Sequence, residues 1–154
     1  MSRLEVIEAS TTKQISDCLK IREEVFINEQ GVPKEEELDE LDNSSFHALA
    51  YIDSVPLATG RLLNISKDNM TIGRMAVLKK YRKNGYGRKV LSFLEVNAER
   101  LGAKIITLHA QLHAKEFYID SGYEEKGNIF LEANIPHIET VSYTHLTLPT
   151  KRIV

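Results

Sequence analysis

The chain has 154 residues, which is the length of one domain and enough to bury a hydrophobic core. Its formal net charge of −2 argues against general affinity for nucleic acid, and no apolar run is long enough to span a membrane. The N-terminal residues lack the apolar core of a signal peptide, and a single cysteine, Cys18, excludes an internal disulfide. We therefore expect a cytoplasmic protein.

The first part of the chain predicts a strand, a helix and two more strands. Residues 3–9 alternate between apolar and polar side chains, as in a half-buried strand. Thr11 and Gln14 have the spacing of a capping box at the start of a helix, which ends at Gly31. An acidic loop then reaches about Ser45, and two strands follow it at residues 46–53 and 57–65.

The second part of the chain predicts further strands and two helices. An apolar segment at residues 71–78 indicates a strand, and a helix begins near Tyr86. The remaining elements are a buried strand at 104–108, a short helix at 114–121, and short strands at 123–125, 129–131 and 138–141. This order of elements predicts an α/β domain in which helices flank a mixed sheet.

A basic loop with two glycines, residues 82–87, connects the strand at residues 71–78 to the next helix. Such a loop presents backbone N–H groups and a helix N-terminus, which together bind phosphate. Gly85 and Gly87 permit close approach of an anion because they carry no Cβ. Positive charge is added by four side chains, Arg82, Lys83, Arg88 and Lys89. The sequence therefore predicts a pyrophosphate site.

Other phosphate-binding motifs and a hairpin are the alternatives for this loop. The spacing of a P-loop is absent, and the dinucleotide-binding pattern lacks its third glycine because Val90 stands at that position. Asn84-Gly85 is also a strong hairpin signal, but a hairpin requires a second alternating strand after Gly87. A helical pattern follows instead, which favours the phosphate-binding loop.

The small net charge conceals two charged blocks. Nine acidic residues and one basic residue lie from Glu23 to Asp42, whereas seven basic residues and no acidic one lie from Asn69 to Leu94. The basic block surrounds the predicted phosphate loop, where it can attract and hold a polyanion. The acidic block has two interpretations, a site for a cationic amine or a solvated acidic loop.

The loop and several segments outside it share motifs with one enzyme family. Arg82, Gly85 and Gly87 match the three defining positions of an (Arg/Gln)-x-x-Gly-x-(Gly/Ala) loop. Three further matching segments are residues 117–123, 22–33 and 135–137. Together they resemble the GNAT superfamily of acetyl-CoA-dependent N-acetyltransferases, and the last two resemble a small bacterial subgroup of undefined substrate. The resemblance implies the GNAT fold, a mixed and mostly antiparallel central sheet flanked by helices.

The resemblance also implies acetyl-CoA as the cosubstrate and the amine of a small molecule as the acceptor, with direct transfer of the acetyl group. The implied cofactor-binding residues are Met75, Ala76, Val77, Arg82, Lys83, Asn84, Gly85, Tyr86, Gly87 and Arg88. Tyr118 aligns with the tyrosine that commonly protonates the departing thiolate, and it is the candidate general acid. The alternative is a core tyrosine on a short amphipathic helix, next to Phe117.

The general base has several candidates. Glu29, Glu36 and Glu37 follow the first helix, near the place where the family's acceptor site usually forms. His109 and His113 lie near a buried strand, and an unperturbed imidazole titrates near neutral pH. A structural or solvated role is the alternative for each of them. No cluster of histidine, cysteine and acidic residues has metal-ligand spacing, so we expect no metal site.

Two other functions stay open on the sequence. A domain of the same fold can be a catalytically inactive CoA-binding or regulatory domain, and the acidic stretch from Glu35 to Asp42 can be the docking surface of an interaction module. A homodimer is an expectation at the level of the family only. We expect neither a nucleic-acid nor a membrane partner.

The C-terminal residues depart from the rest of the chain. We expect a single N-acetyltransferase domain at residues 1–140 and an atypical tail at residues 141–154. The tail does not continue the pattern of a last strand, and its sequence resembles adapter-derived translation rather than a natural ending. We draw no functional inference from His145 and expect the tail to be poorly ordered.

Overall fold

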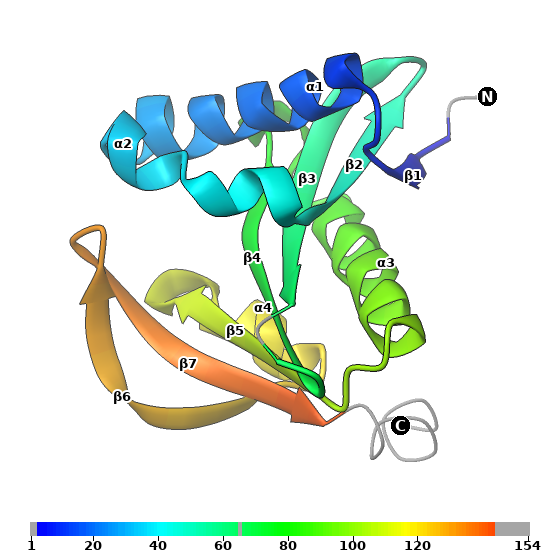
Figure 1. The fold of residues 1–154 in the computed structure, drawn as a ribbon. Helices are drawn as coiled ribbons and strands as arrows, with labels where there is room; N and C mark the ends of the chain where they lie inside the picture. The colour runs from blue at the N-terminus through cyan, green and yellow to red at the C-terminus, as the bar shows by residue number, and fades with distance from the viewer. Residues whose placement is uncertain (1–2, 65, 144–154) are drawn as a thin grey trace.

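The structure is a computed structural model that describes residues 3–64 and 66–143. Within these residues, seven strands form one sheet in the order β1-β2-β3-β4-β5-β7-β6 (Figure 1). The strands are β1 (Glu5–Glu8), β2 (Phe46–Ile52), β3 (Val55–Asn64), β4 (Asn69–Val77), β5 (Ile105–Gln111), β6 (Glu124–Glu132) and β7 (Ile135–Tyr143). Neighbouring strands are antiparallel except β4 and β5, which are parallel. The predicted mixed, mostly antiparallel sheet flanked by helices is confirmed.

The helices connect these strands in the predicted order. The α-helices are α1 (Thr12–Arg22), α2 (Lys34–Glu37), α3 (Tyr86–Arg100) and α4 (Lys115–Asp120). A π-helical segment, η1 (Glu23–Glu29), continues α1, and the 3₁₀ segments are η2 (Glu40–Ser44), η3 (Lys79–Tyr81) and η4 (Leu112–Ala114). The predicted capping box is confirmed, because the N–H of Gln14 donates to Thr11 Oγ1 and the N–H of Thr11 donates to Gln14 Oε1, both at 3.1 Å.

Helices α1 and α3 cover opposite faces of the first half of the sheet (Figure 1). Strand β2 shows why, because its side chains alternate between the two faces. Ala48 and Ala50 lie in the larger core with the apolar face of α3, whereas Leu49 lies in a smaller core with Cys18 and Ile21 of α1. The sheet is therefore buried on both faces where it supports the loop after β4.

The sheet splits between β4 and β5. The two strands pair from Asn69↔Ile105 to Ile72↔Leu108, and no later pair joins them among the described residues. Beyond this point β4 stays paired with β3, and β5 stays paired with β7, so the two halves of the sheet diverge (Figure 1). One edge of β4 after Ile72 and one edge of β5 after Leu108 therefore face the gap.

A bulge in β4 marks the start of the split. Arg74 has a φ of +52°, and the β3–β4 register shifts opposite Gly60. A Cβ at Gly60 would lie 2.6 Å from Leu94 Cδ1 and 2.7 Å from Met75 Sδ, so a larger residue there would require these two side chains to shift. The bulge changes which residues of β4 point to each face just where the strand loses its parallel partner.

The structure corrects the prediction for the last strands. The segments expected as separate strands at residues 123–125 and 129–131 belong to one strand, β6, whose pairing with β7 is irregular between Lys126 and Phe130. A tight turn at Ala133-Asn134, with φ of +51° and +61°, joins β6 to β7. Sequence reasoning missed this turn because no glycine follows the asparagine.

Two other boundaries differ from the prediction. The acidic loop expected up to Ser45 contains α2 and η2. Strand β7 continues to Tyr143, and Ser142 pairs with Ile106 and is 5% exposed, so the regular fold extends past residue 140. The prediction for the remaining tail, residues 144–154, lies outside the described residues.

Candidate active site

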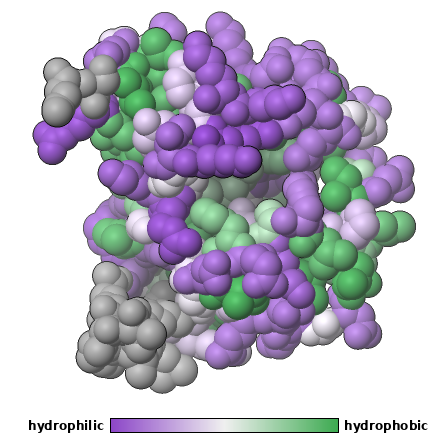
Figure 2. Space-filling view, turned by 180° about the vertical axis from the view of Figure 1, so that it is seen from behind, coloured by the Kyte–Doolittle hydropathy of each residue, from purple (hydrophilic) through white to green (hydrophobic). Residues whose placement is uncertain are grey.

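A pocket of about 1000 Å³ lies at the split between β4 and β5. Its walls come from the ends of both strands, η1, the loop before α3, α4 and the β6–β7 hairpin. Figure 2 shows a recess on this side of the molecule, with an apolar floor and hydrophilic side chains around it. The predicted site residues that line the pocket are Glu29, Glu36, Glu37, Met75, Ala76, Val77, Arg82, Lys83, Gly85, Tyr86, Gly87, Arg88, His109, His113 and Tyr118.

The predicted phosphate loop places the N-terminus of α3 at the pocket. Helix α3 begins directly after Gly85, whose φ of +80° lies in the left-handed region that glycine favours. The side-chain amide of Asn84 does not line the pocket; it donates to the carbonyl oxygens of Tyr81 and Arg82 at 3.1 and 3.2 Å. A Cβ added at Gly87 would lie 3.5 Å from the last side chain of β4, so the helix start packs closely on the strand.

Two basic side chains of this loop region are available to an anion. Lys83 and Arg88 line the pocket, and neither forms an ion pair with another described residue. The guanidinium carbon of Arg88 lies 5.6 Å from the ring centre of Phe117, which is within cation–π range. Free backbone N–H groups at a helix start combined with unpaired cations form an anion site.

Arg82 is already held by protein groups. Its Nη1 and Nη2 donate to the two carboxylate oxygens of Glu29 at 2.6 and 2.7 Å, and its Nε donates to the carbonyl oxygen of Val77 at 2.9 Å. The hydrogen bond and the charge of Arg82 lower the pKa of Glu29, and Glu29 raises the pKa of Arg82. The structure therefore brings a predicted base and a predicted cofactor residue into one ion pair.

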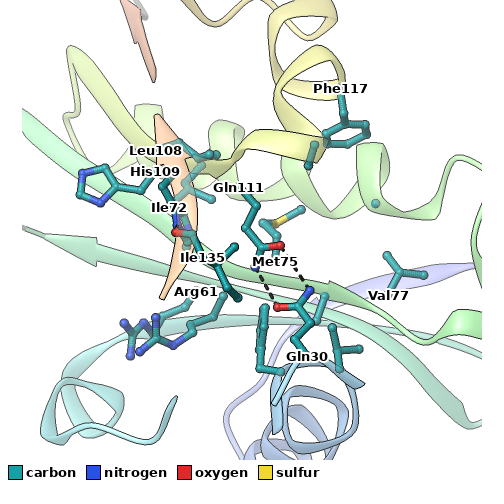
Figure 3. A pocket seen from close by; sticks show the side chains of 18 of the residues that line it. Gln30, Arg61, Ile72, Met75, Val77, Leu108, His109, Gln111, Phe117 and Ile135 are labelled. Carbon is teal, nitrogen blue, oxygen red and sulfur yellow. Dashed lines mark hydrogen bonds between the residues drawn. The ribbon is translucent and has the colours of Figure 1, made fainter. Parts of the chain in front are cut away.

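A pair of carboxamides crosses the pocket beside this ion pair (Figure 3). Gln30 Nε2 donates to Gln111 Oε1 at 3.3 Å, and Gln111 Nε2 donates to Gln30 Oε1 at 2.9 Å. Gln30 follows the end of η1, and Gln111 is the last residue of β5. Sequence reasoning missed both as site residues, although Gln30 lies within the matching segment 22–33; nothing in the sequence marks Gln111.

Tyr118 lies on α4 at the wall of the pocket and is 8% exposed. Its ring contacts the edges of Phe117 and Tyr123, with ring centres 4.9 and 6.1 Å apart. Burial raises the pKa of its phenol, so the group carries its proton at neutral pH. None of the described residues hydrogen-bonds to its hydroxyl.

Three acids of the stretch that follows η1 pair with three arginines from distant segments. Arg22 pairs with Glu37 and Asp42, Arg61 pairs with Asp39 and Asp42, and Arg74 pairs with Glu37 and Asp39. The side chains of Arg22 and Glu37 are 1% and 2% exposed. We call these six residues the buried ion network. It joins α1, β3 and β4 to the segment after η1.

Burial and pairing act in opposite directions on the acids of this network. Burial opposes ionisation of Asp42, but hydrogen bonds and charges from Arg22 and Arg61 prevail and lower its pKa from 3.8 to about 2. For Glu37, burial outweighs the opposing charges of Arg22 and Arg74 and raises the pKa. The second interpretation of the acidic block, a solvated loop, does not describe Glu37 and Asp42, whose side chains are 2% and 13% exposed. The first interpretation, a site for a cationic amine, loses the charge of the acids that pair with arginines.

A histidine faces the pocket on β5, at the first position after the split. His109 Nδ1 lies 3.0 Å from Glu132 Oε1, and its Nε2 lies 3.5 Å from Glu139 Oε1. The hydrogen bond to Glu132 is the main reason that the pKa of His109 is raised above 6.5. The ring of Phe130 meets His109 edge-on with centres 5.0 Å apart. Glu132, from the β6–β7 hairpin, was not predicted from the sequence.

Two further histidines, His137 and His47, have backbone carbonyl groups as their nearest polar partners. His137 lines the pocket, and its Nδ1 lies 2.7 Å from the carbonyl oxygen of Ile135. His47 is 2% exposed, and its Nε2 lies 2.9 Å from the carbonyl oxygen of Asp42. Across residues 3–64 and 66–143, no group of three or more histidine, cysteine or acidic side chains is arranged to hold a metal ion. No described helix is both long and apolar enough to cross a membrane.

Comparison with known proteins identifies the family. The family model of the acetyltransferase (GNAT) domain matches residues 7–141 of the sequence. YjcF of Bacillus subtilis strain 168, named as an uncharacterized N-acetyltransferase, is 39% identical over 140 residues, which cover 88% of this chain and 97% of YjcF. The fold and the split sheet are thus those of an acyltransferase, and the chain belongs to the GNAT acetyltransferase family.

Solved structures agree with this assignment. An acyl-CoA N-acyltransferase from Pseudomonas aeruginosa superimposes with a TM-score of 0.78 at 29% identity, over 91% of this chain and 99% of that one. An aminoglycoside 6′-N-acetyltransferase in complex with coenzyme A has the same fold, with a TM-score of 0.74 at 14% identity over 92% and 96% of the two chains. The GNAT resemblance predicted from the motifs is confirmed, and the protein is an N-acetyltransferase.

Proposed function

We propose that the protein transfers an acetyl group from acetyl-CoA to the amine of a small molecule, in one direct step. The observation that supports this most is the pocket at the split, which joins an anion site at the start of α3 to a second half lined by His109 and Glu132. One half suits the phosphates of acyl-CoA, and the other has room for an acceptor. Coenzyme A bound to a protein of the same fold supports the choice of donor.

The acyl-CoA half uses the loop and the free edge of β4. Backbone N–H groups at Gly85, Tyr86 and Gly87, together with Lys83 and Arg88, would receive the pyrophosphate. The segment Met75-Ala76-Val77 lines the pocket with one edge free of strand pairing, so its peptide groups can pair with the pantetheine amides. In this arrangement the thioester would lie near the bulge at Arg74.

The chemistry follows from this placement. The lone pair of the acceptor nitrogen attacks the thioester carbon, and the C–S bond breaks so that coenzyme A leaves as a thiolate. We propose Tyr118 as the acid that protonates the thiolate, because its phenol lines the pocket and burial keeps it protonated. The proton lost by the amine passes to a base, directly or through water.

For the base, His109 suits the task better than the acids proposed from the sequence. Its hydrogen bond to Glu132 raises its pKa, which makes it a stronger proton acceptor than a free imidazole, and it is 38% exposed where it lines the pocket. Glu29 stays a prediction, and its lowered pKa makes it a weaker proton acceptor. Glu37 also stays a prediction, and its carboxylate already forms ion pairs with two arginines, Arg22 and Arg74.

The acceptor half retains acidic character outside the buried ion network. Glu36 and Glu132 line the pocket there. A surface of this charge suits an acceptor that arrives as an ammonium ion, such as a polyamine or an amino sugar. We also propose that the protein acts in the cytoplasm, where acetyl-CoA and free amines are both present.

The test is release of coenzyme A thiol by the purified protein with acetyl-CoA and a panel of diamines, amino sugars and amino acids. We expect amine-dependent release, reduced in the Tyr118→Phe variant. Binding of acetyl-CoA without turnover on any amine would instead support the alternative, a CoA-binding regulatory domain. Absence of acetyl-CoA binding would contradict both.

A further inference from the structure

Glu29 and Gln30 are neighbours in the chain, and they reach to opposite sides of the split. Glu29 binds Arg82, which follows β4 and η3, at 2.6 and 2.7 Å. Gln30 binds Gln111, the end of β5, at 3.3 and 2.9 Å (Figure 3). The end of η1 is therefore connected to both diverging halves of the sheet, at the level of the pocket where the thioester would lie.

The backbone of β4 explains why Arg82 takes this position. The N–H of Leu78 donates to the carbonyl oxygen of Leu57 on β3 at 2.9 Å. The carbonyl group of Val77 belongs to the same peptide unit and points the other way, toward the edge that β5 has left. Arg82 Nε donates to this carbonyl oxygen at 2.9 Å and so supplies the partner that a neighbouring strand would have supplied.

The guanidinium of Arg82 thus uses three of its five N–H donors on the protein. Its charge is matched by the carboxylate of Glu29 in a two-pronged pair, which fixes both distance and orientation. Lys83 and Arg88 line the same pocket without such a partner. Of these three basic side chains, Arg82 is the one that is fixed before an anion arrives.

We propose that Glu29 is a positioning residue for acyl-CoA binding: through Arg82 it holds the phosphate loop against the end of β4. This inference rests on the proposed function and changes two expectations from the sequence. Glu29 acts on the donor side of the reaction rather than as the base. Arg82 holds the loop in shape, whereas the charge that attracts the pyrophosphate comes from Lys83, Arg88 and the backbone N–H groups.

The competing account makes the opposite prediction about Glu29. If Arg82 bound the pyrophosphate through its own charge, Glu29 would compete with the ligand, and removing its charge would tighten binding. If Glu29 positions the loop, removing its charge weakens binding although the net charge of the site becomes more positive. The sign of the change therefore separates the two accounts.

The experiment is calorimetric titration of acetyl-CoA into the wild type and four variants, Glu29→Gln, Arg82→Gln, the double variant and Arg82→Lys. We expect each single variant to bind about fivefold more weakly and the double variant to bind no worse than either single one, because the two residues act as one unit. Arg82→Lys should bind as weakly as Arg82→Gln, since lysine keeps the charge but not the planar fork. Glu23→Gln is the matched control, an exposed glutamate at the start of η1 that does not line the pocket, and it should bind as the wild type does.

The same titrations at low and high salt supply a readout that a loss of folding would not reproduce. The double variant Glu29→Gln/Arg82→Gln, which keeps the net charge of the site, should leave the salt dependence of the affinity as in the wild type, whereas Lys83→Gln should reduce it. Tighter binding by Glu29→Gln, or recovery of affinity in Arg82→Lys, would overturn the positioning role while leaving the proposed function intact. If the wild type binds no acetyl-CoA, the proposed function fails and this inference fails with it.

Discussion

The two halves of the pocket balance their charges in different ways. In the proposed acceptor half, three acids of the segment after η1 are paired with Arg22, Arg61 and Arg74 in the buried ion network. In the proposed acyl-CoA half, Lys83 and Arg88 line the pocket without an ion pair to a described residue. A block of like charge in a sequence therefore does not reveal whether that charge is offered to a ligand or used to hold the fold.

The largest effect is expected from breaking the buried ion network at Arg22. Replacing Arg22 by methionine leaves Glu37 and Asp42 short of a partner in a buried position, which should lower the free energy of unfolding by about 3 kcal/mol. Urea denaturation of the wild type and the variant measures this difference in the free energy of unfolding. Lys13→Gln is the control, because the Lys13–Asp17 pair has its lysine 81% exposed and should contribute less than about 0.5 kcal/mol. If Arg22→Met lowers the free energy of unfolding no more than Lys13→Gln does, the network does not stabilise the fold.

The next effect concerns chemistry at the junction of the two halves. Tyr118→Phe removes the proposed acid but keeps the ring that packs against Phe117 and Tyr123. We expect kcat to fall about 100-fold while the Kd for acetyl-CoA changes little. Steady-state kinetics combined with calorimetry separate the two quantities. A variant with wild-type kcat would remove Tyr118 from the mechanism.

The pH dependence of stability gives a third comparison. The pKa of Asp42 is lowered from 3.8 to about 2 in the folded protein, so its contribution is fully present above its unfolded pKa and is lost as the pH falls to about 2. The shift corresponds to about 2 kcal/mol. We expect the wild type to lose more stability than Asp42→Asn between pH 5 and pH 2 by about this amount. Identical pH profiles in denaturation experiments would contradict the role assigned to its arginine partners.

The smallest effect is expected in the acyl-CoA half. Lys83→Gln and Arg88→Gln should each weaken acetyl-CoA binding by about 0.5–1 kcal/mol at low salt, and by less at high salt because exposed charges are screened. Neither change should alter the free energy of unfolding, in contrast to Arg22→Met. Lys20→Gln, an exposed change on α1, is the control for net charge. Loss of affinity that is independent of salt would indicate a structural role for these side chains.

The overall fold and the glycine loop before α3 could be predicted because their signals are local. A capping box at Thr11, glycines at positions 85 and 87, and helical spacing after them each lie within a few residues. The merged strand β6 was not predicted, because its turn at Ala133-Asn134 lacks the glycine that usually marks such a hairpin.

The pairings within the site could not be predicted, because they join segments distant in sequence. Glu29 meets Arg82, Gln30 meets Gln111, and His109 meets Glu132 only after the sheet has formed and split. The acidic stretch shows the same limit. Its composition left two interpretations open, a site for a cationic amine or a solvated loop, and gave no sign of its arginine partners, which come from α1, β3 and β4.

The central claim is that acyl-CoA binds in the split between β4 and β5. Hydrogen–deuterium exchange of the protein with and without acetyl-CoA tests it most directly. We expect slower exchange for the amides of residues 73–88, which cover the free edge of β4 and the start of α3, and no change in β1, on the far edge of the sheet. Binding that protects another region, or that leaves residues 73–88 unchanged, would contradict the account.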